Sequence, residues 1–420
     1  MSREIDLNSR RALVGIPIAL AMLSMIGPFS IDTPFPAFTQ MGEEFGATTQ
    51  QMQLVVTSYL LAFAVMSLFH GPISDAVGRR PVIVASVGLY VLACLGAAFS
   101  PTLGVLLCFR VLQGLFAGGA TIVSRTIIRD LYEGDQAQRL MSRVAMIFGL
   151  APAIAPVVGG VALQWGPWPV VFWLMAGLGV ALILTTVLVV PESHPPERRT
   201  PLALRPVLSG LVAVGRDAAF ARVALAASFA FGAQFLYIGG ASIFVVDVLG
   251  LGELDFWVFF VPMIGGMVVG SWISGRAAGR ISGRRLVSLG FTVALAGGVL
   301  GVALAAGSRG GEAPWALVGP TLVALGNGML YPTLNLMMLD LFPQRRGAAV
   351  SGGSFLTLVL NAAVAAVVTP VVGTSALGFA VTAIAMVVTG LVFWSWHLAI
   401  ELRDTEVPTH REDLEPTDLM

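Results

Sequence analysis

The most visible absence in this sequence is lysine. All 24 basic residues of the 420-residue chain are Arg, which excludes chemistry that needs a lysine amine, such as a Schiff base or a Walker-type phosphate loop. Charge is scarce as well, at 11% of residues, whereas soluble domains carry about 25%. The formal net charge is zero, so the chain has no overall basic field to attract nucleic acid, and no nucleic-acid partner is expected.

Cysteine and enzyme motifs are scarce or missing too. The two cysteines, Cys94 and Cys108, both fall inside apolar runs, where free thiols are more common than a disulfide or a metal pair. The sequence has no HExxH, no GxSxG and no nucleotide-binding loop, which argues against an enzyme and against ATP as an energy source. We therefore expect no metal and no cofactor; an intramembrane enzyme or receptor is the alternative from another class.

Apolar residues are abundant, at 56% with a mean hydropathy of +0.85. Runs of about 20 apolar residues, each long enough to cross a bilayer, occur as six plus six around a polar linker. This pattern predicts an all-α membrane protein with 12 transmembrane helices in two pseudo-symmetric six-helix bundles. The runs lie near residues 12–34, 51–70, 81–99, 102–124, 140–163 and 169–190, and then 219–246, 256–275, 286–306, 315–338, 347–369 and 375–398.

The composition along the chain predicts four parts. Residues 1–190 should form the N-terminal bundle and residues 218–400 the C-terminal bundle. Residues 191–217 are too polar to span a membrane and are expected to be a solvated cytoplasmic tether. Residues 401–420 are charged and lack periodicity, which predicts a disordered tail.

The arginines predict the orientation in the membrane. Nearly all of them lie in the amino terminus and in the connections that follow the second, fourth, sixth, eighth and tenth runs. The connections on the other face hold only Arg309. Because positive residues favour the cytoplasmic side, we expect a multi-pass protein of the inner (cytoplasmic) membrane with both termini in the cytoplasm.

A tight basic turn lies between the second and third runs. Residues 71–81 read GPISDAVGRRP, and a weaker echo, GRAAGRISGRR, occupies residues 275–285. Similar turns in matching places of the two halves are typical of a duplicated membrane bundle. The echo lacks a counterpart of Asp75, so any gate built from these turns should be asymmetric.

One acid, Asp32, lies well inside a run. A carboxylate is costly in hydrocarbon, and ionisable residues there are functional by default, so Asp32 is a candidate to take up and release a proton. Pro28, Pro34 and Pro36 should kink or break its helix and free backbone carbonyls, as at the wall of a cavity. The alternative is a hydrogen-bonded structural Asp near the outer end of the helix.

One basic residue, Arg110, also lies within a run, in the same half of the membrane as Asp32. A direct salt bridge between the two is one possibility, and an arginine that snorkels to the outer surface is another.

Polar residues in apolar surroundings are candidates for a substrate cavity, although each one alone is more often a helix-packing hydrogen bonder. Met and Phe could add an adaptable apolar wall. The candidates are Met25, Phe29, Gln113, Gln234, Tyr237, Asn327 and Asn361.

The order of these motifs resembles a known family. SIDTPFPAF, GPISDAVGRRP, RVLQG, RTIIRDLYEG, GLAPAIAPVVGG and LFPQRRGAAVSG together resemble the major facilitator superfamily, and within it the drug:H+ antiporters with 12 spans of the Bcr/CflA (bicyclomycin and chloramphenicol resistance) branch. The resemblance covers most of the chain.

The resemblance implies roles for named residues. Asp32 and Arg110 would couple proton movement. Gly71, Asp75, Gly78, Arg79, Arg80 and Asp130 would form a cytoplasmic gate, with Asp75 at the start of span 11 near Gly347 and Arg79 reaching Asp130. Gly149, Pro152, Pro156, Gly159 and Gly160 would be the antiporter motif of drug exporters, and small-residue packing is the alternative for this stretch.

The predicted function is therefore proton-coupled multidrug efflux by alternating access, with antibiotic resistance as its consequence. The expected partners are a small-molecule drug or metabolite, protons as the coupling ion and the lipid bilayer, and the chain is expected to be monomeric. The alternative in the same class is an exporter or importer of a metabolite such as an amino acid or a sugar.

Overall fold

The computed structural model describes residues 14–132, 134–199, 204–252, 254–277, 279–307, 309–343 and 345–406, and within these ranges it is helical without a strand. Ten of the described helices are long and apolar enough to cross a membrane. The pair α3 (Thr49–Ser67) and α4 (His70–Val77), bent by 50°, makes an eleventh if it is counted as one span. The helix α7 (Gly134–Ala162) holds a shorter apolar stretch, Leu150–Trp165, at the place of the predicted fifth run. The predicted fold class is confirmed.

The long helices of the first half are α1 (Ile16–Asp32), α3, α5 (Arg79–Ala98), α6 (Leu103–Leu131), α7 and α8 (Pro169–Val189). Those of the second half are α10 (Ala218–Gly239), α11 (Phe256–Ala277), α12 (Gly283–Ala305), α13 (Trp315–Asp340), α14 (Arg346–Ala363) and α16 (Ala376–Glu406). Short elements are η2 (Phe35–Ala37), α2 (Phe38–Phe45), η3 (Leu163–Trp165), η4 (Pro196–Arg198), the π-helical turns η5 (Ile243–Val248) and η6 (Val364–Val368), and α15 (Thr369–Val372).

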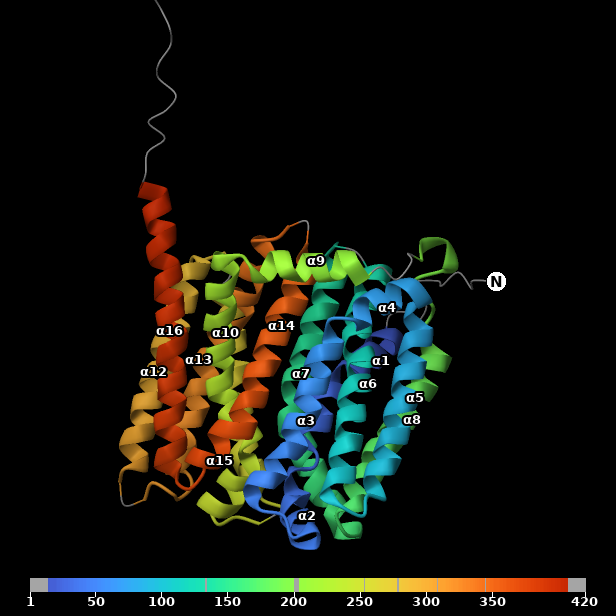
Figure 1. The fold of residues 1–420 in the computed structure, drawn as a ribbon. Coiled ribbons are helices and arrows are strands. Elements are labelled where there is room, and N and C mark those ends of the chain that lie inside the picture. Colours follow the sequence, from blue (N-terminus) through green and yellow to red (C-terminus); the bar gives the residue numbers. More distant parts are fainter. Residues whose placement is uncertain are drawn as a thin grey trace, which may run out of the picture.

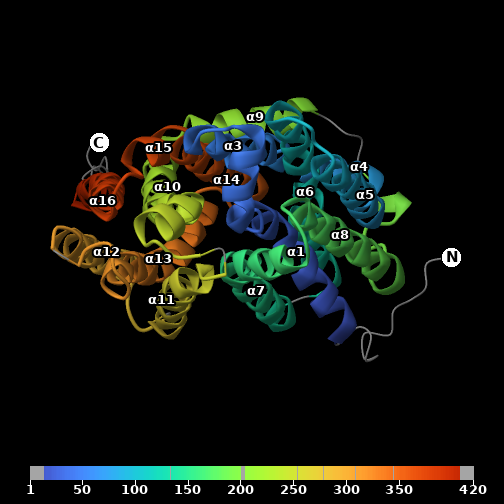
Figure 2. The same cartoon turned by 90° about the horizontal axis from the view of Figure 1, so that it is seen from below.

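The two halves repeat one packing pattern. In the first, α6 packs on α1, α3 and α5; in the second, α13 packs on α10, α11 and α12. Figure 2 shows the first half, blue to green, beside the second, yellow to red. Between the halves, α3 contacts α14, and α7 contacts α11.

Glycine allows the helices to approach closely. A methyl group at Gly270 of α11 would lie 2.0 Å from the carbonyl oxygen of Leu325, and one at Gly114 of α6 would lie 2.3 Å from that of Tyr59. These helices therefore pack backbone against backbone, as small residues permit in membrane bundles.

The segment 191–217 is more than a solvated tether, because it contains the helix α9 (Leu204–Gly215). Val214 of this helix is fully buried, and a methyl group at Gly210 would lie 3.5 Å from Cβ of Ala348, so α9 packs on α14. Figure 1 shows α9 across one end of the bundle and α2 at the other. We call these ends the α9 end and the α2 end.

The segment expected to be a disordered tail also begins as helix. α16 continues to Glu406, so residues 401–406 are helical. Residues 407–420, the rest of the predicted tail, lie outside the described residues.

Candidate functional site

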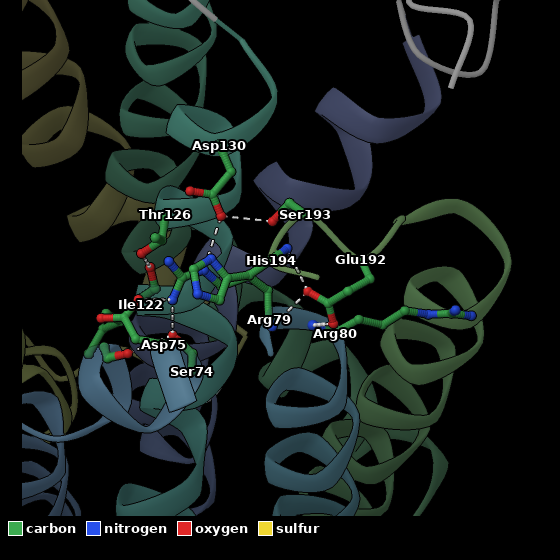
Figure 3. A network of polar contacts seen from close by, with 11 residues as sticks. Ser74, Asp75, Arg79, Arg80, Ile122, Thr126, Asp130, Glu192, Ser193 and His194 are labelled. Carbon is green, nitrogen blue, oxygen red and sulfur yellow. Dashed lines mark hydrogen bonds and ion pairs between the residues drawn. The ribbon is translucent and has the colours of Figure 1, made fainter. Parts of the chain in front are cut away.

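The basic turn at residues 71–81 lies at the α9 end, within a network of polar contacts (Figure 3). Gly78 joins α4 to α5 with φ of +110°, a conformation that residues other than glycine rarely adopt. A Cβ there would lie 2.8 Å from Nη2 of Arg199 and 2.9 Å from Oε2 of Glu192. Only glycine therefore leaves room for the side chains that close over this turn.

Arg79 is the centre of the network, and it is only 4% exposed. Its Nη1 lies 2.5 Å from Oδ1 of Asp75 and donates to Oγ of Ser74 at 2.6 Å, and its Nε donates to Oδ2 of Asp130 at 3.0 Å. Arg79 thus ties the end of α4 to the end of α6.

The remaining predicted gate residues differ in their surroundings. The ion pair of Asp75 is with Arg79, four residues on, and its side chain is 45% exposed. The guanidinium of Arg80 donates to the carbonyl of Val187 in α8. Cβ atoms added at Gly71 or Gly347 would meet no atom within 4 Å, so neither glycine is required by close packing.

The sequence analysis missed two members of this network, Glu192 and Ser193. The carboxylate of Glu192 accepts from the backbone N–H of Arg79 at 2.9 Å and of Arg80 at 3.2 Å, so it caps α5, which Gly78 cannot cap. Ser193 donates to Oδ2 of Asp130 at 2.8 Å. Glu192 could have been predicted from its place in the sequence, because it is an acid that directly follows the sixth span, on the same face of the membrane as the basic turn.

The echo in the second half is braced differently. There Arg284 forms an ion pair with Glu401, near the end of α16, and both side chains are partly exposed, at 45% and 39%. Exposed pairs of this kind contribute about 0–1 kcal/mol. The buried network around Arg79 in the first half therefore stabilises its turn more than this ion pair stabilises the turn of the second half.

Arg110 is fully buried in α6, so its guanidinium stays inside the bundle and does not snorkel. It lies over the ring of Tyr59, 4.6 Å from the ring centroid, and Nε donates to the carbonyl of Val55 at 2.9 Å. Its Nη1 donates to Oε1 of Gln113 at 2.7 Å and to the carbonyl of Ser30 at 3.0 Å.

The contact with Ser30 explains how a broken helix can hold a buried arginine. In a regular helix the carbonyl of Ser30 would accept from the N–H of residue 34, and Pro34 has none. α1 ends at Asp32 and the 3₁₀ turn η2 follows, as the prolines predicted. The freed carbonyl is satisfied by Arg110.

Asp32 is the last residue of α1 and is 1% exposed. Its Oδ1 has no hydrogen-bond partner, and neither has Nη2 of Arg110. The ion pairs of the structure do not join these two residues, although both are fully described. The arrangement thus leaves a buried acid and a buried base each with an unused polar atom.

Comparison with known proteins identifies the family. The model of the Major Facilitator Superfamily matches residues 20–364. The chain belongs to this superfamily. It is thus a multi-pass membrane protein, and membership confirms the prediction of a transporter rather than an enzyme.

Curated relatives in the superfamily include drug-resistance proteins. A bicyclomycin resistance protein homolog of Haemophilus influenzae is 26% identical over 293 residues, 70% of this chain and 74% of its own. Multidrug resistance protein D of Escherichia coli is 29% identical over 352 residues, 81% of this chain and 84% of its own. These relatives agree with the predicted Bcr/CflA branch.

Solved structures confirm the superfamily fold. A bacterial homolog of the human lysosomal transporter Spinster, in an inward-facing and unoccupied conformation, aligns with a TM-score of 0.71 at 16% identity, covering 94% of this chain and 99% of its own. A D-xylose-proton symporter aligns with a TM-score of 0.71 at 15% identity, covering 91% and 97%.

The stretch that resembles the superfamily's antiporter motif lies on α7. Pro152 and Pro156 are inside this helix, as are Gly149, Gly159 and Gly160. A Cβ at Gly159 would lie 2.2 Å from the carbonyl oxygen of Thr33, the residue after Asp32. The stretch therefore packs directly on the backbone where α1 ends.

The predicted cavity residues are all buried or half-buried. Asn327 donates to Oε1 of Gln234 at 2.6 Å, which pairs α13 with α10. Tyr237 stacks on Phe379 with ring centroids 5.4 Å apart. Oε1 of Gln113 accepts a hydrogen bond from Nη1 of Arg110. Phe29 and Asn361 are buried and Met25 is half-buried, and Oδ1 of Asn361 has no partner.

Proposed function

We propose that this transporter is a proton-coupled exporter of amphipathic drugs or similar small molecules, and that it works as a monomer by alternating access. In this proposal it lies in the inner membrane with the α9 end in the cytoplasm. The arginines support this orientation, because residues 79, 80, 284 and 285 all belong to the basic turns at the α9 end. The names of the drug-resistance relatives support the class of cargo.

The observation that carries the proposal is the buried carboxyl group of Asp32, whose Oδ1 has no hydrogen-bond partner. A buried charge without a partner is costly, so the group gains by binding either a proton or a polar cargo. Exchange of one for the other is the basis of antiport. Arg110 would tune this exchange through its positive charge, while its Nε and Nη1 donate to the carbonyls of Val55 and Ser30 and no ion pair joins it to Asp32.

The proton gradient is large enough for the task. A charge that crosses 100 mV supplies about 2.3 kcal/mol. Since about 1.4 kcal/mol corresponds to a factor of ten, one proton exchanged for one neutral drug molecule can sustain roughly a 40-fold to 50-fold gradient of the drug.

The proposal is tested with Asp32→Asn in proteoliposomes that carry an imposed pH gradient. We expect proton-driven drug efflux to be abolished while expression and folding stay normal. Asp255→Asn, at a half-buried acid in the connection between α10 and α11, is the matched control and should transport like the parent protein. Undiminished pH-driven efflux by Asp32→Asn would refute the proposal.

A further inference from the structure

A cavity of about 370 Å³ opens at the α2 end, between the two halves of the transporter. The first half contributes α2 and the start of α3, and the second half contributes η5 and the residue before it. Ligand sites in proteins commonly measure about 300–1,000 Å³ and combine apolar walls with a few polar groups. This cavity is therefore large enough for a small organic molecule.

The lining of the cavity has an apolar part and an acidic part. Phe38, Met52 and Ile243 are apolar and almost completely buried. Glu43 from the first half and Asp247 from the second are exposed carboxylates, and none of the lining residues is basic. The chemistry suits a molecule with an apolar body and one positive charge.

The two lining acids differ from the other described acids nearby. Oε2 of Glu44 accepts from the indole N–H of Trp168 at 2.6 Å, and Oδ2 of Asp255 accepts from the backbone N–H of Gly252 at 3.1 Å. Within the described ranges, no ion pair or side-chain hydrogen bond engages Glu43 or Asp247. Partial burial raises the pKa of the Asp247 carboxyl group, so a nearby positive charge would stabilise its ionised form.

We infer that this cavity is a binding site for lipophilic organic monocations, with Glu43 and Asp247 as the groups that recognise the positive charge. If the proposed export function holds, this cavity is the last site that the cargo occupies before release outside. Binding of the cation does not depend on that function. Because the two carboxylates belong to different halves, their separation changes when the halves move, so the affinity for the cation changes with the transport state.

The probe for binding is tetraphenylphosphonium, with the neutral triphenylphosphine oxide for comparison, and the sample is the purified full-length protein. We expect the double variant Glu43→Gln, Asp247→Asn to bind the cation about 2-fold to 30-fold more weakly, as the loss of two exposed ionic contacts predicts, and to bind the neutral compound unchanged. Asp255→Asn is the control with the same kind of charge change and should bind like the parent.

A second measurement reports the place of binding. In a Cys108→Ser background, Thr39→Cys puts a reactive thiol on an exposed lining residue, while Cys94 is buried. Tetraphenylphosphonium should slow maleimide labelling of this thiol, and the double variant should need a correspondingly higher cation concentration for the same protection. Equal cation affinity in parent and double variant, or labelling that the cation does not slow, would overturn the inference.

Failure of this inference can be told apart from failure of the proposed function. Asp32→Asn should still show charge-dependent protection of the thiol at position 39, because the cavity does not include Asp32. Protection without any proton-driven efflux by the parent would sink the proposed function alone. Efflux that needs Asp32 but is accompanied by no protection would sink the cation site alone.

Discussion

Replacement of Glu192 by Ala is the most informative perturbation of the network at the α9 end. Its carboxylate accepts three backbone N–H groups, from Arg79, Arg80 and His194. Loss of an acceptor at the start of a helix costs about 0.5–2 kcal/mol, and here two amides of α5 lose theirs. If the network forms in one transport state only, a change of about 1–2 kcal/mol shifts the balance of states by roughly 5-fold to 30-fold.

The variant should therefore turn over drug several-fold more slowly in proteoliposomes while it binds drug with nearly the parent affinity, because the network lies at one end of the bundle. Glu192→Gln keeps one acceptor oxygen and should lie between Ala and the parent. Glu197→Ala removes the same charge from an exposed position in η4 and is the control. The reasoning is refuted if Glu192→Ala and Glu197→Ala have the same turnover and the same thermal midpoint.

Two further variants test neighbouring contacts. Asp75→Asn should also slow turnover with drug affinity retained, but less than Glu192→Ala, because the ion pair of Asp75 with Arg79 is half-exposed and contributes at most about 1 kcal/mol; a loss confined to affinity would count against a gate. Gly159→Ala places a methyl group 2.2 Å from the carbonyl oxygen of Thr33 and should destabilise the protein by about 1–3 kcal/mol in thermal unfolding. The control is Gly177→Ala, whose added methyl group would meet no atom within 4 Å and should leave the stability unchanged. Equal thermal midpoints for the two variants would contradict the close packing of α7 on α1.

The sequence predicted those features that depend on local composition. Long apolar runs located the spans, because only helices and closed barrels satisfy the backbone in lipid. The prolines after Asp32 predicted the end of α1, because they remove N–H donors. The short helix α9 was missed because its amphipathic period covers only 12 residues within a segment rich in Pro and Arg.

Contacts between distant parts of the chain could not be predicted in the same way. Glu192 bonds to backbone amides 112 and 113 residues away, and every residue except proline carries such an amide, so the pairing leaves no pattern in the sequence. The cavity at the α2 end likewise depends on how closely α2 and η5 approach each other, which the lengths of the spans do not determine.

The position of α7 suggests how a proton at Asp32 could influence the second half. α7 packs on the backbone of Thr33 through Gly159, and it also contacts α11 across the boundary between the halves. A change of charge at Asp32 alters what the end of α1 must bind, and α7 packs closely on that end at Gly159. Since coupling requires an element whose position both sites influence, α7 is the element through which the proposed proton binding at Asp32 would act on the movement of the halves.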